Sequence, residues 1–369
     1  MRILLLWTYY ENYLRQFYLH NPSVSRLPFA DQKQLLLEDG FLWPAHMIDE
    51  FRKLGHEADI VVGNADPAQA TWALENGLAS STLRADIVRE QIRSYRPDIL
   101  WTCCAERYRG EFLRSVRDDC GAVVGWSAEF GAEQFDWSGV DCVLSSHSNF
   151  VQAFRDMGLR SELVLPCVNP KLVADCLSAT SHRTRDVTFY GTLAVHLFKE
   201  RLKFLSAITR HVQCDIYADR MRWRRRPWPP RSFLAQFRYV PFRLRNRFKP
   251  PVFGRDLLRL IASSKIVLNA HVDAANGLAG NIRMFEVTAM GALLLTDPSP
   301  NISELFEPDK EIVTYENAAD AVKKLRHYLS RPEELQAIAA AGQERTLRSY
   351  NCTIRAGEVM RIFSDVTRS

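Results

Sequence analysis

Short apolar runs alternate with amphipathic stretches along most of the chain, and this alternation predicts repeated strand–helix units. In the first half, buried strands are expected at residues 3–7, 58–62, 98–102, 122–125, 142–145 and 163–165. Helices are expected between them, at residues 41–54, 81–95, 111–118 and 150–157. Strands that alternate with helices indicate a parallel, doubly wound α/β sheet.

The same rhythm restarts after a polar stretch at residues 169–185, which we expect to be an irregular linker. Strands are expected at 187–190, 214–217, 266–268 and 292–295, with helices at 197–211, 257–263, near Asn317 and from Pro332. This predicts an N-terminal domain at 1–168 and a C-terminal domain at 169–350, followed by a helix at 351–369 that is free to return to the first domain. The length of 369 residues fits two domains, and two doubly wound domains predict a ligand cleft between them.

The most specific pattern lies at residues 265–350. An apolar strand ends in Asn269-Ala270-His271, and a Gly/Asn-rich loop leads into a helix that carries Asn281, Arg283 and Glu286. The segments GALLLTD, LFEPDKEIVTY and IAAAGQERTL follow in that order. This series resembles the C-terminal half of bacterial glycosyltransferases related to the spore-maturation protein CgeB.

The resemblance implies a GT-B fold, with two Rossmann-like domains and a cleft between them. It also implies transfer of a sugar from a nucleotide-diphosphate sugar to an acceptor hydroxyl on a glycan, a lipid-linked glycan or a protein. Bacterial surface glycan or glycoconjugate synthesis is the expected setting. Two other classes stay open: a nucleic-acid or polyanion-binding protein, and an inactive GT-B scaffold.

Asn281, Arg283 and Glu286 form the strongest candidate site. Arg283 and Glu286 are three residues apart and share a helix face. A planar guanidinium matches two phosphate oxygens, and a carboxylate accepts ribose hydroxyls; the alternative is an internal Arg–Glu pair. The resemblance assigns the ribose to Glu286. Many GT-B enzymes carry an earlier acid that residues 276–279 lack, so we expect Asn269, His271 or Asn281 to contact the donor sugar.

A second candidate region follows the strand at 187–190. Gly191 and Thr192 form a single-glycine turn before a helix, which is either a plain βα turn or, as the resemblance implies, an approach to the donor diphosphate. Lys199 falls near the start of that helix, where it either neutralises the diphosphate or is a solvated helix residue.

Candidate catalytic residues come from the first half. Glu106, Glu129 and His147 each follow a strand, where a carboxylate or imidazole can act as general base on an acceptor hydroxyl. The alternative is that each is a polar loop residue. No D-x-D triplet occurs in the chain, so we expect a reaction without a metal or other cofactor.

Charge is distributed unevenly along the chain. The net charge is +5, but residues 220–249 hold eleven Arg or Lys and no acid, so the remainder sums to 5 − 11 = −6. Seven aromatic residues are interleaved with these bases. The segment is a solvated surface insertion, a docking site for an anionic membrane, or a site for a polyanionic acceptor.

Composition indicates an intracellular location. No apolar run approaches the roughly 18 residues of a membrane-spanning helix, and the N-terminus lacks a small-residue cleavage site. The eight cysteines include no CxxC pair and fit a reducing compartment. We therefore expect a cytoplasmic protein that is free to associate with the inner face of the membrane; the sequence does not indicate an oligomeric state.

Overall fold

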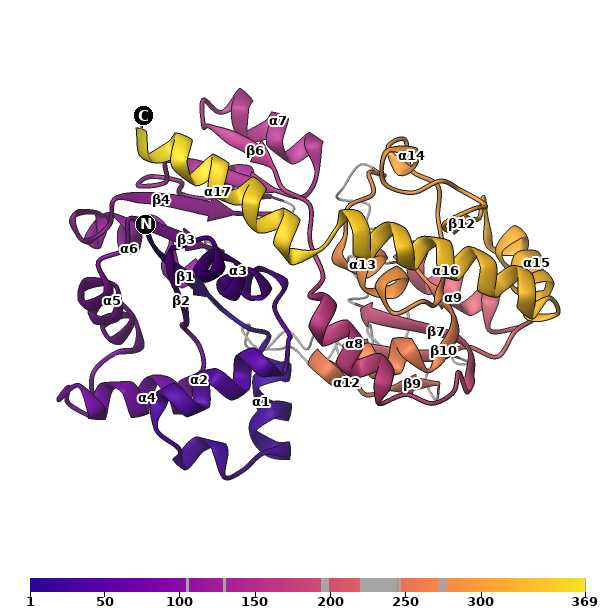
Figure 1. Ribbon diagram of the computed structural model, residues 1–369, viewed down its shortest axis with the longest axis horizontal. Helices are drawn as coiled ribbons and strands as arrows, with labels where there is room; N and C mark the ends of the chain where they lie inside the picture. The colour runs from indigo at the N-terminus through magenta and orange to yellow at the C-terminus, as the bar shows by residue number, and fades with distance from the viewer. Residues whose placement is uncertain are drawn as a thin grey trace, which may run out of the picture. The chain divides into compact units, whose positions relative to one another are not determined.

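The chain forms two compact units of α/β structure. The structure, a computed structural model, describes residues 1–103, 106–128, 131–193, 199–219, 244, 247–271 and 277–368. One unit comprises Met1–Asn169 together with Tyr350–Ser369, and the other comprises Pro170–Ser349. Each unit is described by itself below (Figure 1).

The first unit is built on a parallel sheet whose strand order is β2-β1-β3-β4-β5-β6 among the described residues. Ile3 pairs with Ala58 on one side and with Ile99 on the other, so β1 is central and buried. All six strand predictions for this half have a counterpart, and the last is shifted towards the N-terminus. The strands are β1 (Arg2–Trp7), β2 (Glu57–Val62), β3 (Ile99–Thr102), β4 (Ala122–Trp126), β5 (Cys142–Ser145) and β6 (Ser161–Leu163).

The helices of the first unit differ from the prediction in several places. The sequence pattern did not predict the helices at 11–20, 29–38 and 66–75, and the helix expected at 111–118 is divided into an α-helix at 111–115 and a 3₁₀ helix at 117–119. The single helix expected at 41–54 is a 3₁₀ helix, η2 (Trp43–Met47), followed by α3 (Ile48–Lys53). Pro44 lies in the first turn of η2, where its missing backbone N–H is tolerated. The other α-helices are α1 (Glu11–His20), α2 (Phe29–Glu38), α4 (Asp66–Glu75), α5 (Arg84–Tyr95), α6 (Glu111–Ser115), α7 (Ser148–Asp156) and α17 (Cys352–Arg368). The remaining 3₁₀ helices are η1 (Val24–Arg26), η3 (Glu106–Tyr108), η4 (Arg117–Asp119) and η5 (Ala132–Gln134).

The C-terminal helix α17 packs on the first unit rather than on the second. The Phe363 ring lies 5.6 Å from Trp101 and 6.1 Å from Phe51 between centroids. Thr353 donates its hydroxyl to Glu50 Oε2 at 2.9 Å. Figure 1 shows this helix in yellow. The chain thus begins and ends in the same unit.

The second unit contains another parallel sheet, in the order β12-β11-β10-β7-β8-β9 among the described residues. Val267 pairs with Thr188 of β7 and Leu294 of β11, and all three side chains are buried. The strands are β7 (Arg185–Thr192), β8 (Asp215–Asp219), β9 (Phe248–Lys249), β10 (Ser264–Leu268), β11 (Leu293–Thr296) and β12 (Val313–Thr314).

A helix occupies the segment that we expected to be an irregular linker. The 169–185 prediction is wrong over α8 (Pro170–Ser178), where Leu172, Val173 and Cys176 form a buried stripe. This stripe is short, but α8 packs against α12 (Gly254–Ala262), which supplies the apolar partner. The other helices are α9 (Lys199–Ile208), α13 (Ile282–Ala289), α14 (Ile302–Leu305), α15 (Ala318–Leu329) and α16 (Pro332–Ser349).

Candidate functional site

The strand order of the second sheet contains a topological switch point between β7 and β10. From β7 the chain moves outward through β8 and β9, then returns to the other side of β7 as β10. In open α/β sheets, ligands bind beyond the carboxyl ends of the strands at such a point. The residues that follow β7, β10 and β11 are therefore candidates for contact with a ligand.

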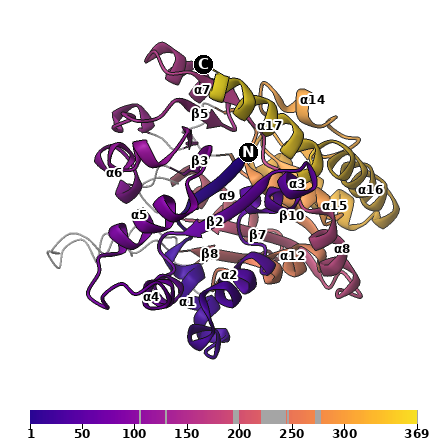
Figure 2. The same cartoon turned by 60° about the vertical axis from the view of Figure 1, so that its left-hand side comes forward.

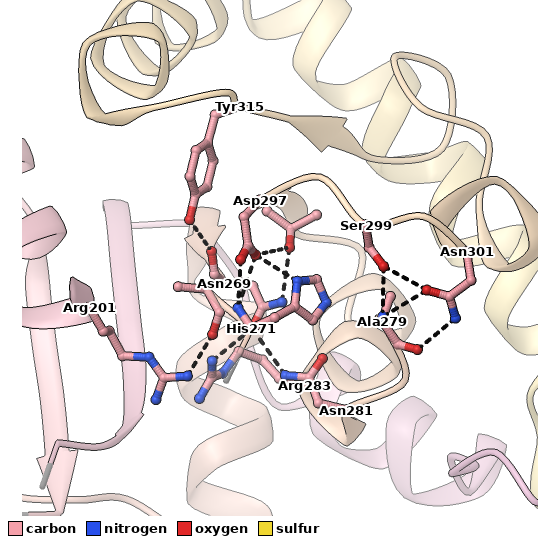
Figure 3. Close-up of polar contacts among 12 residues, drawn as sticks. Arg201, Asn269, His271, Ala279, Asn281, Arg283, Asp297, Ser299, Asn301 and Tyr315 are labelled. Atoms are coloured by element: carbon pink, nitrogen blue, oxygen red, sulfur yellow. Dashed lines mark hydrogen bonds and ion pairs between the residues drawn. The ribbon is translucent and has the colours of Figure 1, made fainter. Parts of the chain in front are cut away.

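Asn269, the first residue after β10, is a hydrogen-bonding hub with no exposed surface. Its Oδ1 accepts from Arg283 Nη1 at 2.8 Å and from Asn281 Nδ2 at 3.1 Å. Its Nδ2 donates to Thr296 Oγ1 at 3.0 Å, and the Tyr315 hydroxyl donates to its backbone carbonyl at 2.9 Å (Figure 3). These bonds fix the amide and, through it, the two side chains that come from the start of α13.

Arg283 lies between β10 and the end of β7. It is 9% exposed, and its Cζ sits 4.9 Å from the Tyr190 ring centroid and 5.3 Å from that of Phe189. Gly191, with φ +142°, passes so close that an added Cβ would overlap Arg283 Nη2. Arg283 Nε has no hydrogen-bond partner among the described residues. The guanidinium is held by a neutral amide, and its charge also favours ionisation of Glu286.

The N-terminus of α13 adds a second electropositive feature. Asn281 occupies the N-cap position with extended backbone angles, φ −74° and ψ 146°, yet its side chain does not cap the helix. The amide donates to Asn269 instead, and its Oδ1 has no partner within the described part of the chain. Backbone N–H groups at an uncapped helix start attract anions, phosphate above all.

Glu286 lies on α13 and contacts β7. Its Oε2 accepts from the Tyr190 hydroxyl at 2.8 Å. Burial raises the pKa of Glu286, and the Tyr190 hydrogen bond and the charge of Arg283 oppose that shift. Glu286 is thus bonded to Tyr190 on β7, whereas Arg283 Nη1 donates to Asn269 at the end of β10.

His271 and Asp297 pair at the ends of β10 and β11. The His271 backbone N–H lies 3.0 Å from both Asp297 carboxylate oxygens, and His271 Nδ1 lies 2.7 Å from Oδ1. Burial disfavours ionisation of Asp297, but the hydrogen bonds from His271 and Thr296 outweigh it and lower its pKa. His271 Nε2, on the other side of the ring, has no hydrogen-bond partner among the described residues.

Arg201, on α9, is a buried cation that sequence reasoning missed. It is 7% exposed and donates to the Thr192 carbonyl at 3.2 Å and to the Ala270 carbonyl at 2.6 Å. It therefore ties the ends of β7 and β10 together across the switch point. Its helix neighbours Leu202 and Leu205 are buried core residues. An arginine next to this apolar stripe was the feature of the sequence that could have indicated a buried cation.

A second set of contacts that the sequence did not indicate fixes the segment before α13. Ala279 donates its N–H towards Ser299 Oγ and Asn301 Oδ1, both at 2.8 Å, and accepts from Asn301 Nδ2 at 2.9 Å (Figure 3). These contacts link the segment before Asn281 to the loop after β11.

The structure brings together most of the residues predicted for the second half. Gly191 and Thr192 lie at the same sheet edge as the hub formed by Asn269, but they are the last residues of β7 and not a separate turn, because β7 pairs with β8 as far as Thr192. Lys199 begins α9, and its side chain lies outside what the structure describes.

The candidates of the first half do not assemble in the same way. His147 is the residue before α7, is 6% exposed, and has Nδ1 2.9 Å from Ser146 Oγ. It is therefore a buried residue at a helix start. Glu106 begins η3, but its side chain is outside the described structure, and Glu129 lies wholly outside the described residues.

The described residues contain neither a metal-binding cluster nor a membrane-spanning helix. No group of three His, Cys, Asp or Glu side chains there is arranged to hold a metal ion. No described helix is long and apolar enough to span a bilayer.

Two parallel doubly wound units define the GT-B architecture, as predicted, and comparisons with known proteins agree with this. A family model described as glycosyl transferase-like matches residues 199–361, a stretch that runs from α9 into α17. A search of curated protein sequences finds no match.

Solved glycosyltransferase structures share the fold over nearly the whole chain. Sucrose-phosphate synthase from Thermosynechococcus elongatus is 11% identical, with 99% of each chain covered and a TM-score of 0.58. HepE from Anabaena, in complex with UDP and glucose, is 11% identical over 99% of this chain and 100% of its own, with a TM-score of 0.58. An alpha-glucosyltransferase in complex with UDP-glucose and DNA is 10% identical over 99% of both chains, with a TM-score of 0.61.

Proposed function

We propose that this protein is a glycosyltransferase that moves a sugar from a nucleotide-diphosphate sugar to an acceptor hydroxyl. One observation carries the proposal: buried Arg283 and the uncapped start of α13 converge at the switch point between β7 and β10. Two fixed positive features at one sheet edge suit a diphosphate. The glycosyl transferase-like match over residues 199–361 supports the same reading.

Each residue of the site has a role in this proposal. Arg283 and the first N–H groups of α13 bind the diphosphate, and Glu286 accepts hydrogen bonds from the ribose hydroxyls. The hydrogen bond from the Tyr190 hydroxyl to Glu286 Oε2 fixes the orientation of this carboxylate. His271 and Asn281, each with a buried polar atom that has no described partner, bind the donor sugar.

UDP is the first nucleotide to test, because the similar HepE and alpha-glucosyltransferase structures contain UDP or UDP-glucose. We propose that the transferred unit is a hexose or a related sugar and that the reaction needs no metal, with Arg283 neutralising the leaving diphosphate. Bacterial surface glycan synthesis, kinship with the CgeB-related group and a cytoplasmic location remain proposals that rest on the sequence.

Thermal-shift measurements with UDP, GDP, dTDP and CMP, and with their sugars, test the proposal. A ligand at 100 times its dissociation constant stabilises the folded state by about 2.7 kcal/mol. We expect one nucleotide and its sugar conjugate to raise the melting temperature well above the others. No shift from any of them at millimolar concentration would contradict the proposed donor site.

The segment at 220–249 stays a candidate for docking on an anionic membrane surface. Most of it lies outside the described residues, so the proposal rests on its eleven basic and seven aromatic residues. Co-sedimentation with anionic vesicles at low salt is the expected outcome, and a protein that stays in the supernatant would exclude it.

A further inference from the structure

The first unit contains a pocket that none of the roles above uses. Its volume is about 310 Å³, and the residues that line it come from β1, β2, α2, α4 and α5. Figure 2 labels β2 and the three helices in the indigo and purple part of the chain. Small-molecule sites span roughly 300–1,000 Å³, whereas one water molecule occupies about 30 Å³. Arg2, the first residue of β1, lines it, so the pocket reaches the edge of the sheet opposite to the carboxyl ends.

Gln91, on α5, is the feature that marks this pocket as a binding site. It lines the pocket and is 5% exposed, yet neither its Nε2 nor its Oε1 has a hydrogen-bond partner among the described residues. Buried polar groups in proteins are almost always satisfied, and an unsatisfied amide is costly. All residues that line the pocket lie within 1–103, which the structure describes throughout.

Gln32, on α2, shows what a purely structural buried glutamine looks like in the same unit. It has no exposed surface, and its Nε2 donates to the Leu27 carbonyl and to Thr71 Oγ1, both at 2.9 Å. Its Oε1 accepts from the Tyr18 hydroxyl at 3.3 Å. The contrast indicates that the Gln91 amide is kept for a partner from outside the chain.

The charges that line the pocket are already balanced. Lys33 donates to both carboxylate oxygens of Asp59, at 2.8 and 2.6 Å. Arg2 pairs with Glu57 at 3.2 Å. A strongly charged ligand would have to break these pairs, so the pocket suits a neutral one.

The remaining walls combine aromatic rings with polar groups. Phe29, Trp72 and Tyr95 line the pocket and are half-buried, and the exposed Ser94 also lines it. Lys33 lies over the Phe29 ring and Arg2 over the Tyr95 ring, so Trp72 is the ring that the proposal relies on. Aromatic rings give apolar contact to the C–H faces of a ligand, while an amide both donates and accepts. A neutral ring that carries many hydroxyl groups matches this combination.

We propose that this pocket binds a neutral saccharide unit, with the Gln91 amide hydrogen-bonded to its hydroxyl groups. The site lies within the first unit and is independent of the nucleotide site proposed above. It holds saccharide without taking part in transfer, as an anchoring site for a glycan.

Saturation-transfer NMR with glucose, galactose, mannose and N-acetylglucosamine tests this proposal on the full chain. The decisive variant is Gln91→Met, which keeps the shape of the side chain and removes the amide. We expect at least one sugar to give a signal with the wild-type protein and the affinity to fall at least ten-fold in Gln91→Met. Arg283→Ala, which alters only the proposed nucleotide site, should keep the signal.

Thermal unfolding separates a binding role from a structural one. Gln91→Met should melt at or above the wild-type temperature, because the amide makes no hydrogen bond within the described part of the chain. Gln32→Met, which loses three bonds, should melt lower. The proposal is overturned if no sugar binds, if Gln91→Met binds like the wild type, if it is destabilised like Gln32→Met, or if only Arg283→Ala abolishes the signal.

Discussion

Replacing Gly191 with alanine is expected to weaken nucleotide binding while the second unit stays folded. Gly191 has φ +142°, where residues with a side chain are strained, and an added Cβ would lie 3.3 Å from Arg283 Cζ and overlap Nη2. Because the guanidinium is the movable end of this contact, we expect Arg283 to turn away. It would then lose its 2.8 Å bond to Asn269 and its position for a diphosphate.

The size of the effect follows from these contacts. Backbone strain at such a position costs about 1–3 kcal/mol of stability. Loss of one hydrogen bond to a charged group costs roughly 1.5–3 kcal/mol, which corresponds to an affinity for UDP that is about 10- to 150-fold lower. Calorimetric titration measures the affinity, and thermal unfolding measures the strain.

Gly158→Ala is the matched control. Gly158 also has a positive φ, +81°, but a Cβ there would meet nothing within 4 Å. It should lower the melting temperature through strain of about 1–2 kcal/mol and leave the affinity unchanged. Wild-type affinity in Gly191→Ala would refute the reasoning.

Three further outcomes are expected. Glu286→Gln should raise the melting temperature at pH 7, because burial raises the pKa of Glu286 and makes its ionisation costly in the folded state. The gain should vanish below about pH 4.3, where this carboxyl is protonated in the unfolded chain as well. A difference in melting temperature that does not depend on pH would contradict this reasoning. Tyr315→Phe should cost about 0.5–1.5 kcal/mol in urea unfolding, since it removes the 2.9 Å bond to Asn269 while the stack on Phe204 remains, and an unchanged midpoint would count against the hub. Turnover should persist in EDTA, and a complete loss that Mn²⁺ restores would reveal a metal site.

Local sequence patterns predicted the buried strands well. The sequence predicts strands at 266–268 and 292–295, and β10 and β11 cover nearly the same positions. The prediction works because a parallel strand that is buried on both faces is apolar throughout. A helix was predicted near Asn317, and α15 begins there; the Asn317 side chain accepts from the backbone N–H groups of Ala319 and Asp320 and caps the helix.

Contacts between distant segments could not be predicted in this way. Arg201 binds a carbonyl 69 residues away, and Asp297 holds a histidine 26 residues away, and no local spacing marks either pair. The stripe of α8 is too short to stand out until α12 covers it. Gln91 is conspicuous only because its amide lacks a partner, which depends on everything packed around it.

Calorimetric titration of UDP, or of the nucleoside diphosphate that the thermal-shift panel selects, is the most direct test of the account. It compares the wild type with Arg283→Ala and with Arg259→Ala, whose exposed side chain on α12 pairs with Asp256 at 3.1 Å. We expect the wild type and Arg259→Ala to bind alike and Arg283→Ala to show no measurable binding while it melts as a folded protein. Equal affinity in all three proteins would contradict a nucleotide site at the switch point of the second sheet.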